Sequence, residues 1–326
     1  MESFRARRSH RARPSRTRPL LCTALAVVTV VGGTAAGSVY AKARAHSGAG
    51  PVSSSATADG EESVEPVAQP AVDHAAVLAR AMRSVSVESD AEVSVAVLDL
   101  DSGESASYGN GAFDTASIVK VDILATLLLQ AQDVARHLTA SEKSYATTMI
   151  EDSDNDSASA LWRIIGKADG LDAANERLGL TDTEGGDGML WGLTQTTAAD
   201  QLTLLQQVFG DDSLLGEASR TYLQGLMGQI AADQHWGVSA AADGSEWALK
   251  NGWLARSTTG LWDINSIGRV RVDGRRCLVT VLSKGNSTKA KGISLVETAA
   301  KAAVGSLAGA HSTPTASASP SASAAR

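Results

Sequence analysis

Cysteine is scarce in this sequence, and proline is confined to its two ends. Cys22 lies in an apolar stretch near the N-terminus, which leaves Cys277 as the single thiol of the folded part and excludes a disulfide or a cysteine-based zinc site there. All seven prolines lie at or before Pro70 or at or after Pro314, so the 243 residues from 71 to 313 contain none. This break in composition predicts one domain over residues 71–308, and a hydrophobic content of 43% supplies ample material for its core.

Net positive charge is also missing from most of the chain. The net charge of −7 combines two unlike parts: residues 1–19 contain seven arginines against Glu2, a sum of +6, which leaves −13 for the remainder. A body this acidic repels phosphate groups. The charge pattern therefore argues against nucleic acid as a partner.

The N-terminal arginines precede an apolar run, Leu20–Ala41, that contains 22 residues and no charge. A positive segment followed by an apolar one is typical of an export signal or of a single membrane anchor. We therefore expect residues 1–43 to be one of these. The protein would be extracytoplasmic, either secreted or held at the membrane through this segment alone. Residues 44–70 and 309–326 are rich in small and polar residues and are expected to be a disordered linker and a disordered Ser/Ala-rich tail.

Hydrophobic periodicity predicts strands near both ends of the domain, with a long helical block between them. Strands from both ends must share one sheet, which makes the fold class α+β with an inserted all-helical region. The predicted helices cover 71–85, 117–130 and 289–307, with several more over 139–240; the predicted strands are a hairpin over 92–108 and single strands over 247–254, 263–272 and 276–283.

A Ser-x-x-Lys motif opens the most apolar of these helices. Ser117 and Lys120 are three residues apart and therefore share one helix face. A serine hydroxyl needs an adjacent base to act as a nucleophile, and a desolvated lysine amine can lose its proton and supply that base. The helix start also presents backbone N–H groups to a developing oxyanion. Alone, the motif is weak, because about one such match is expected by chance in this composition.

Two further tripeptides follow Ser-x-x-Lys along the chain. Ser153–Asn155 has the sequence Ser-Asp-Asn and lies 36 residues after Ser117, and Lys250–Gly252 has the sequence Lys-Asn-Gly and begins the third strand. Taken alone, the first is a helix cap or turn and the second a solvated strand end. The glycine at 252 would allow a substrate backbone to lie against the strand.

Together, in this order and on these elements, the three motifs resemble the S-x-x-K, S-D-N and K-T-G set of the penicillin-recognising serine hydrolases, which include class A β-lactamases and penicillin-binding proteins. The resemblance spans about residues 71–308. It implies a β-lactamase/transpeptidase-like fold, with an antiparallel sheet flanked by helices and an inserted helical region. It also implies acylation by a small-molecule β-lactam or a peptidoglycan peptide, without a cofactor.

The resemblance assigns a role to each motif residue. Ser117 would be the nucleophile, Lys120 its base and Ser153 a relay that passes a proton to the leaving nitrogen. Backbone N–H groups of Ser117 and Trp253 would form the oxyanion hole. The substrate-binding residues would be Asn155 for the substrate's side-chain amide, Lys250 for its carboxylate, and Asn251, Gly252 and Trp253 beside them.

The sequence departs from the family pattern at two places that bear on chemistry. Asn251 stands where a Thr or Ser hydroxyl is usual, although an amide N–H can still donate to a carboxylate. The Glu-x-x-Leu-Asn motif, whose glutamate activates the deacylating water in class A enzymes, is absent from the equivalent stretch, 181–197. Asp182, Glu184 and Asp187 are the carboxylates of that stretch, and we interpret them as solvated loop residues. Deacylation is therefore expected to be slow.

The alternative function is a non-catalytic module that binds cell wall or β-lactam on the same fold. Of the six tryptophans, Trp191 and Trp253 are expected near the site and the others in the core. The histidines show no metal-ligand spacing, so no metal site is expected. We expect the chain to be a monomer that meets a membrane only through its N-terminal segment.

Overall fold

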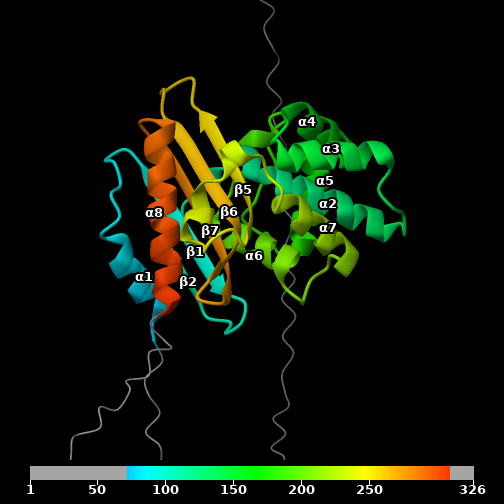
Figure 1. Ribbon diagram of the computed structural model, residues 1–326. Coiled ribbons are helices and arrows are strands. Elements are labelled where there is room, and N and C mark those ends of the chain that lie inside the picture. Colours follow the sequence, from blue (N-terminus) through cyan, green and yellow to red (C-terminus); the bar gives the residue numbers. More distant parts are fainter. Residues whose placement is uncertain (1–71, 309–326) are drawn as a thin grey trace, which may run out of the picture. The chain divides into compact units, whose positions relative to one another are not determined.

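A five-stranded antiparallel sheet forms the centre of the domain. The computed structural model describes residues 72–308, and the predictions for 1–43, 44–70 and 309–326 lie outside these described residues. The strand order in the sheet is β2-β1-β7-β6-β5 (Figure 1). The hairpin from the start of the domain therefore joins the three strands from its end through the pairing of β1 with β7. The predicted α+β class with one shared sheet is confirmed.

The strands of this sheet are β1 (Glu92–Asp99), β2 (Ser105–Tyr108), β5 (Trp247–Ala255), β6 (Trp262–Val272) and β7 (Arg275–Asn286). The helices are α1 (His74–Met82), α2 (Val119–Asp133), α3 (Ala140–Glu151), α4 (Asn155–Ile164), α5 (Lys167–Leu178), α6 (Ala198–Phe209), α7 (Glu217–Met227) and α8 (Lys289–Ala308). Short 3-10 turns are η1 (Ala116–Ile118), η2 (Trp191–Leu193), η3 (Ala232–Gln234) and η4 (Gly237–Ala241), and two short strands, β3 (Phe113–Asp114) and β4 (Gln195–Thr196), pair apart from the main sheet.

The two faces of the sheet are covered by different parts of the chain. Helices α1 and α8 lie on one face and the inserted helices on the other (Figure 1). Alternation along β1 divides its side chains accordingly: Val95 and Val97 belong to the apolar cluster that contains α8, and Ala96 and Leu98 to the cluster that contains α2. The sheet therefore has two hydrophobic cores, one on each side.

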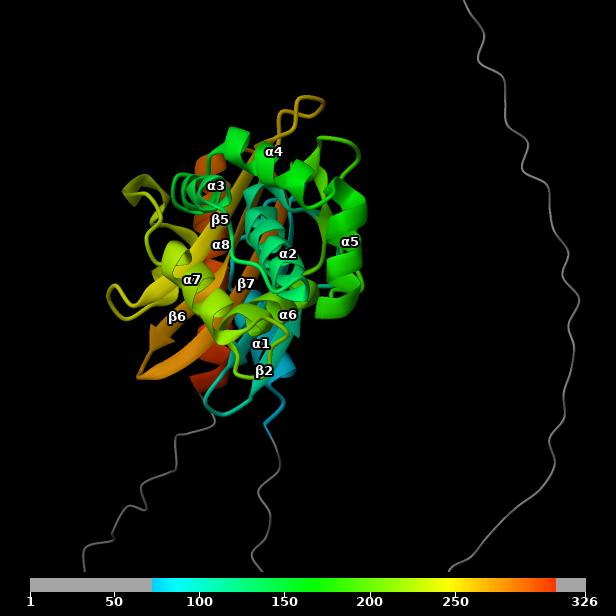
Figure 2. The ribbon, with the colours of Figure 1, turned by 90° about the vertical axis from the view of Figure 1, so that its right-hand side faces the viewer.

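Helix α2 is the centre of the helical region, as its apolar sequence predicts. Twelve of its fifteen residues are buried, and α3, α4, α5 and α7 all contact it (Figure 2). A helix enclosed on most sides is held in a fixed position by its packing. The packing therefore also holds the first turn of α2, and the side chains that it carries, in place.

The expected elements are all present, but several boundaries differ. The first helix is shorter than 71–85, because Asp73 caps it and accepts a hydrogen bond from the Ala76 amide. The helix expected from residue 117 begins with the 3-10 turn η1 and continues as α2. The paired strands β3 and β4 were not predicted, because two residues are too few to show a periodic pattern.

Within residues 72–308, no helix is both long and apolar enough to cross a bilayer. In the same part of the chain, no three His, Cys, Asp or Glu side chains gather as metal ligands would. Cys277 is buried in β7, and burial raises the pKa of its thiol to about 11. It packs as a small apolar residue, as its place in a strand-like run indicates.

Candidate active site

Ser117 lies in the tight turn η1 that leads into α2. Ala116, the residue before it, has a φ of +48°, a left-handed conformation that an L-residue adopts at some cost. The segment is clamped to β6, because the buried amide of Asn265 donates to the carbonyl oxygens of Asp114 (2.9 Å) and Thr115 (3.0 Å). These two hydrogen bonds hold the half-buried Ser117 at the start of α2.

Asn265 was not singled out from the sequence. Its partners are 150 and 151 residues away, so no local pattern reveals the contact. One signal was present: an asparagine in the middle of an apolar strand must find hydrogen-bond partners if it is buried. Its side-chain oxygen also accepts from the Ser283 amide (3.1 Å), so the whole side chain is occupied in positioning.

Ser153 lies in the sharp turn between α3 and α4 and has a φ of +58°. Asp154 forms the cap of α4 by accepting from the Ser157 amide (2.7 Å), which is the structural role expected for an isolated Asp at this position. The cap holds Ser153 and Asn155 on either side of Asp154 in a fixed geometry. Both of these side chains face the N-terminal turn of α2.

Lys120 joins the first two motifs. Its Nζ donates to the carbonyl oxygen of Ser153 (2.6 Å), to Ser153 Oγ (3.1 Å) and to Asn155 Oδ1 (2.8 Å). A charged amine uses every N–H in these three bonds, whereas a neutral amine makes two of them and keeps a lone pair. The side chain has no exposed surface. The Ser-x-x-Lys and Ser-Asp-Asn motifs, which are 33 residues apart at this contact, therefore form one hydrogen-bonded unit.

Lys250 brings the third motif to the same point. Its Nζ donates to Ser153 Oγ (3.0 Å) and to the Asn251 carbonyl oxygen (3.0 Å). The hydroxyl of Ser153 thus accepts from two amines, which leaves its own O–H as the donor that can be directed elsewhere. An oxygen that is bonded to two proton carriers and can still donate is suited to relay a proton.

Burial and mutual repulsion set the protonation of the two lysines. Burial lowers the pKa of Lys120 to about 7, an effect that the charge of Asp154 partly opposes. Burial also lowers the pKa of Lys250 well below its ordinary value, and the nearby charge of Lys120 lowers it further. A neutral amine is therefore available near neutral pH, and an amine poised in this range can act as a base.

Gly252 is in close contact with the turn that carries Ser117. A Cβ at this position would lie 2.7 Å from the Thr115 carbonyl oxygen and 2.9 Å from the Ser117 amide nitrogen, closer than carbon atoms approach in proteins. The third residue of the Lys-Asn-Gly motif must therefore be glycine for β5 to pack against η1. This reason differs from the expected one, which was close approach of a substrate backbone.

The side chains of Asn251 and Trp253 differ from expectation. Successive residues of a strand face opposite sides, so both point away from the face that carries Lys250. Asn251 is fully buried and its amide donates to the carbonyl oxygens of Gln234 (2.8 Å) and Trp236 (3.0 Å). Its expected contact with a substrate carboxylate is thus corrected: the amide stabilises the structure instead.

Trp253 packs in the layer of α8 rather than beside Ser117. Its ring lies 6.0 Å from that of Trp236, and the Nζ of Lys289 stands 4.1 Å from the ring centroid. The side chain therefore does not line the site as expected. The backbone of Trp253 remains in β5, one residue beyond Gly252, where its expected role as an oxyanion-hole donor requires it.

Trp191 does lie at the site. The Nζ of Lys120 stands 5.0 Å from the centroid of its ring. Trp191 belongs to the segment 179–197, which includes the stretch 181–197 that lacks the Glu-x-x-Leu-Asn motif. In contrast, Asp182, Glu184 and Asp187 are exposed on this segment, as expected for solvated loop residues.

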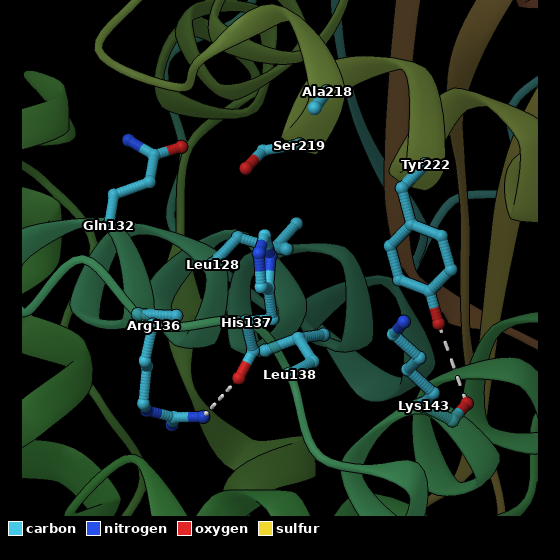
Figure 3. A pocket seen from close by; sticks show the side chains of 10 residues that line it. Leu128, Gln132, Arg136, His137, Leu138, Lys143, Ala218, Ser219 and Tyr222 are labelled. Atoms are coloured by element: carbon cyan, nitrogen blue, oxygen red, sulfur yellow. Dashed lines mark hydrogen bonds between the residues drawn. The ribbon is translucent and has the colours of Figure 1, made fainter.

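A separate cavity of about 230 Å³ opens at the far end of α2, between α2, α3 and α7 (Figure 3). Leu128 and Tyr222 supply apolar surface, and Arg136 on its rim is paired with Glu142. None of the motif residues lines this cavity. It is therefore distinct from the site formed by Ser117, Lys120 and Ser153.

Solved structures with the same architecture are class A β-lactamases and a penicillin-binding protein. A class A β-lactamase from Bacteroides cellulosilyticus matches with a TM-score of 0.63 and 17% identity, over 72% of this chain and 98% of that one. A mutant of PBP-A, solved as an acyl-enzyme complex with penicillin G, matches with a TM-score of 0.62 and 18% identity, over 72% and 96%. A β-lactamase from Burkholderia vietnamiensis matches with a TM-score of 0.60 and 20% identity, over 75% and 100%. The fold is therefore that of class A β-lactamases.

The family follows from the sequence itself. The profile of the beta-lactamase enzyme family matches residues 132–307, more than half of the 326-residue chain. The chain belongs to this family and is a serine hydrolase that works through an acyl-enzyme. The matched range includes Ser153 and Lys250 and begins after Ser117 and Lys120. No curated protein sequence matches the chain significantly.

Proposed function

We propose that this protein is acylated on Ser117 by β-lactams or by a cell-wall peptide, and that the acyl-enzyme is hydrolysed slowly. The observation that carries the proposal is the convergence of two buried lysine amines on the Ser153 hydroxyl, at 3.1 Å from Lys120 and 3.0 Å from Lys250. The acyl-enzyme complex of the PBP-A mutant with penicillin G supports a β-lactam as the probe.

Neutral Lys120 begins the proposed reaction by taking the proton of the Ser117 hydroxyl. The Ser117 oxygen then bonds to the carbonyl carbon, whose oxygen becomes an anion stabilised by the backbone N–H groups of Ser117 and Trp253. When the carbon–nitrogen bond breaks, Ser153 gives its proton to the leaving nitrogen. Ser153 then takes a proton from the Lys120 ammonium, which received it from Ser117, so every proton is accounted for.

Lys250 and Asn155 would bind the substrate. A carboxylate at Lys250 favours the charged form of that amine and offsets the pKa lowering that burial and Lys120 cause. Asn155 accepts from Lys120 through Oδ1, which leaves its NH₂ group as a donor to the substrate's side-chain carbonyl. Because Gly252 has no Cβ, it would allow β5 to pack against the turn that carries Ser117.

Slow deacylation is proposed because the segment 179–197 brings no carboxylate to the site. A general base must come within about 3 Å of the water it activates, or reach it through one further water. Asp182, Glu184 and Asp187 are exposed to solvent, and no hydrogen bond joins their carboxylates to Lys120 or Ser153 in residues 72–308. The two amines bonded to Ser153 support acylation, whereas no carboxylate of this segment supports hydrolysis as a base.

The experiment is intact-mass measurement of the protein after mixing with penicillin G. A single adduct on wild-type protein and none on Ser117→Ala supports the assignment of the nucleophile. An adduct of equal yield on the alanine variant overturns that assignment.

We also propose export, from the seven arginines that precede Leu20–Ala41. Cell fractionation of the full chain tests this, with a variant lacking residues 20–41 as the control. The full chain is expected outside the cytoplasm and the deletion variant inside. An intracellular full chain contradicts the proposal.

A further inference from the structure

Trp191 is the side chain of the segment 179–197 that contacts the candidate base. Its ring faces the Lys120 Nζ at 5.0 Å from the centroid, and its indole N–H donates to Ser159 Oγ (3.1 Å) on α4. The hydrogen bond fixes the ring orientation, since an indole has a single donor. The ring is half-buried against the apolar cluster that contains α2. The ring therefore covers Lys120 in a fixed orientation.

The backbone around Trp191 is anchored on both sides. The fully buried Trp162 donates from its indole N–H to the Gly188 carbonyl oxygen (2.9 Å), and Glu184 pairs with Gln195 through two backbone hydrogen bonds (3.0 and 2.9 Å). A Cβ at Gly192 would lie 3.9 Å from Ala116 Cα, so the turn that holds Trp191 lies directly against the segment before Ser117. The ring of Trp191 is therefore held by α4 and by the Glu184–Gln195 pair, beside the turn that carries the nucleophile.

The ring has two opposing electrostatic effects on Lys120. The face of an indole attracts an ammonium, which favours the charged amine. The same ring displaces water from the amine, which favours the neutral form. Burial among all its neighbours is the leading cause that lowers the pKa of Lys120 to about 7, and the Trp191 ring is one of those neighbours. The charge of Asp154 opposes this lowering, and the charge of Lys120 in turn lowers the pKa of Lys250.

We propose that Trp191 is a positioning residue that keeps water from Lys120 and thereby prolongs the acyl-enzyme. This inference rests on the proposed roles of Ser117 and Lys120. Hydrolysis requires a water whose oxygen bonds to the ester carbon while its proton passes to a base; the bond from that carbon to Ser117 Oγ then breaks, and Oγ takes the proton back. Neutral Lys120 is the base in this step, because it is the base proposed for Ser117. The Lys120 side chain has no exposed surface, and Trp191 covers its Nζ on the side of the segment 179–197.

The test compares Trp191→Ala, Trp191→Phe and the control Leu190→Ala, all in the full chain. Leu190 is the exposed neighbour of Trp191 on the same turn, so its loss tests general loosening of the segment. Each variant is mixed with penicillin G, and intact mass gives both the rate of adduct formation and the adduct half-life from pH 5 to pH 9.

Trp191→Ala is expected to shorten the adduct half-life by about tenfold or more, because a positioned base contributes about 10²–10⁴-fold. It should also move the midpoint of the acylation pH profile upward by about 1, since hydration favours the charged amine. Trp191→Phe keeps a ring and should retain the half-life within about threefold and the pH midpoint nearly unchanged. Leu190→Ala should leave them unchanged. A simple structural role would not move the pH midpoint.

The proposal is overturned if Trp191→Ala still forms the adduct at the wild-type half-life and pH midpoint, or if Leu190→Ala has the same effect as Trp191→Ala. If the alanine variant does not fold, Trp191→Leu keeps apolar packing and removes most of the ring, and the same outcomes apply to it. Absence of any adduct on wild-type protein is a different result, because it contradicts the proposed function and not the role of Trp191.

Discussion

The two sides of the candidate site are built in contrasting ways. On the side of the sheet and α2, two buried lysines and a serine hydroxyl form a network in which each amine lies within 3.1 Å of the same oxygen. On the side of the segment 179–197, the carboxylates point to solvent and an aromatic ring covers the base. We propose that the first side moves protons and that the second excludes water. On this account the difference between the two sides separates acylation from hydrolysis.

The largest effect is expected from removing the nucleophile on the first side. Ser117→Ala should abolish adduct formation with penicillin G, because no other Ser-x-x-Lys serine is present in the chain. The fold should survive, since loss of a half-buried hydroxyl costs on the order of 1 kcal/mol. Intact mass measures the adduct and thermal unfolding measures the fold. An alanine variant that fails to fold leaves Ser117→Gly and its adduct yield as the check.

The next largest effect should separate the two lysines. With an ester substrate that lacks a carboxylate, Lys120→Ala is expected to lose about 10²–10⁴-fold in acylation rate, the range for a general base. Lys250→Ala should lose far less, because its main proposed role is to hold a carboxylate. Stopped-flow measurement of acylation provides the comparison. Equal losses in the two variants on this substrate would show that the amines do not have separate roles.

The sequence alone predicts a contact in the site well when the two residues are close together in the chain. Ser117 and Lys120 share a helix turn, so their spacing predicts that they lie on one face. The opposite orientation of Asn251 and Lys250 also follows from strand alternation, and the family resemblance led to the wrong side for the Asn251 amide. A prediction of which face a side chain lies on is reliable where the period of the helix or strand is known.

Contacts between distant segments could not be predicted in the same way. Trp191 meets Lys120 across 71 residues, and Asn265 meets the turn before Ser117 across about 150. Such contacts depend on how the helical region packs against the sheet, which no local pattern encodes. The sequence could suggest that Trp191 lies near the site, but not that its ring faces the amine.

A smaller and graded effect is expected from pH. Since burial lowers the pKa of Lys120 to about 7, the fraction of neutral amine falls about tenfold per pH unit below that value and changes little above it. The acylation rate should therefore rise with pH up to about 7 and then level off. A pH–rate profile of adduct formation checks this. A rate that is flat from pH 5 to pH 9 would contradict Lys120 as the base.

The smallest effect is expected from the exposed carboxylates of the second side. Asp182→Asn, Glu184→Gln and Asp187→Asn should each change steady-state turnover by less than about twofold, because solvated groups distant from the reacting atoms contribute little. Steady-state hydrolysis of a chromogenic β-lactam measures this. A variant that loses turnover by tenfold identifies the water-activating base and removes the contrast between the two sides.

The most direct test of the central claim is the time course of the acyl-enzyme after rapid mixing with excess penicillin G. The account predicts a burst of one product per protein molecule, an adduct on Ser117 that accumulates on nearly every molecule, and a slow steady state limited by its hydrolysis. Linear hydrolysis without a burst, with no adduct detected by mass, would mean that deacylation is faster than acylation and would contradict the account.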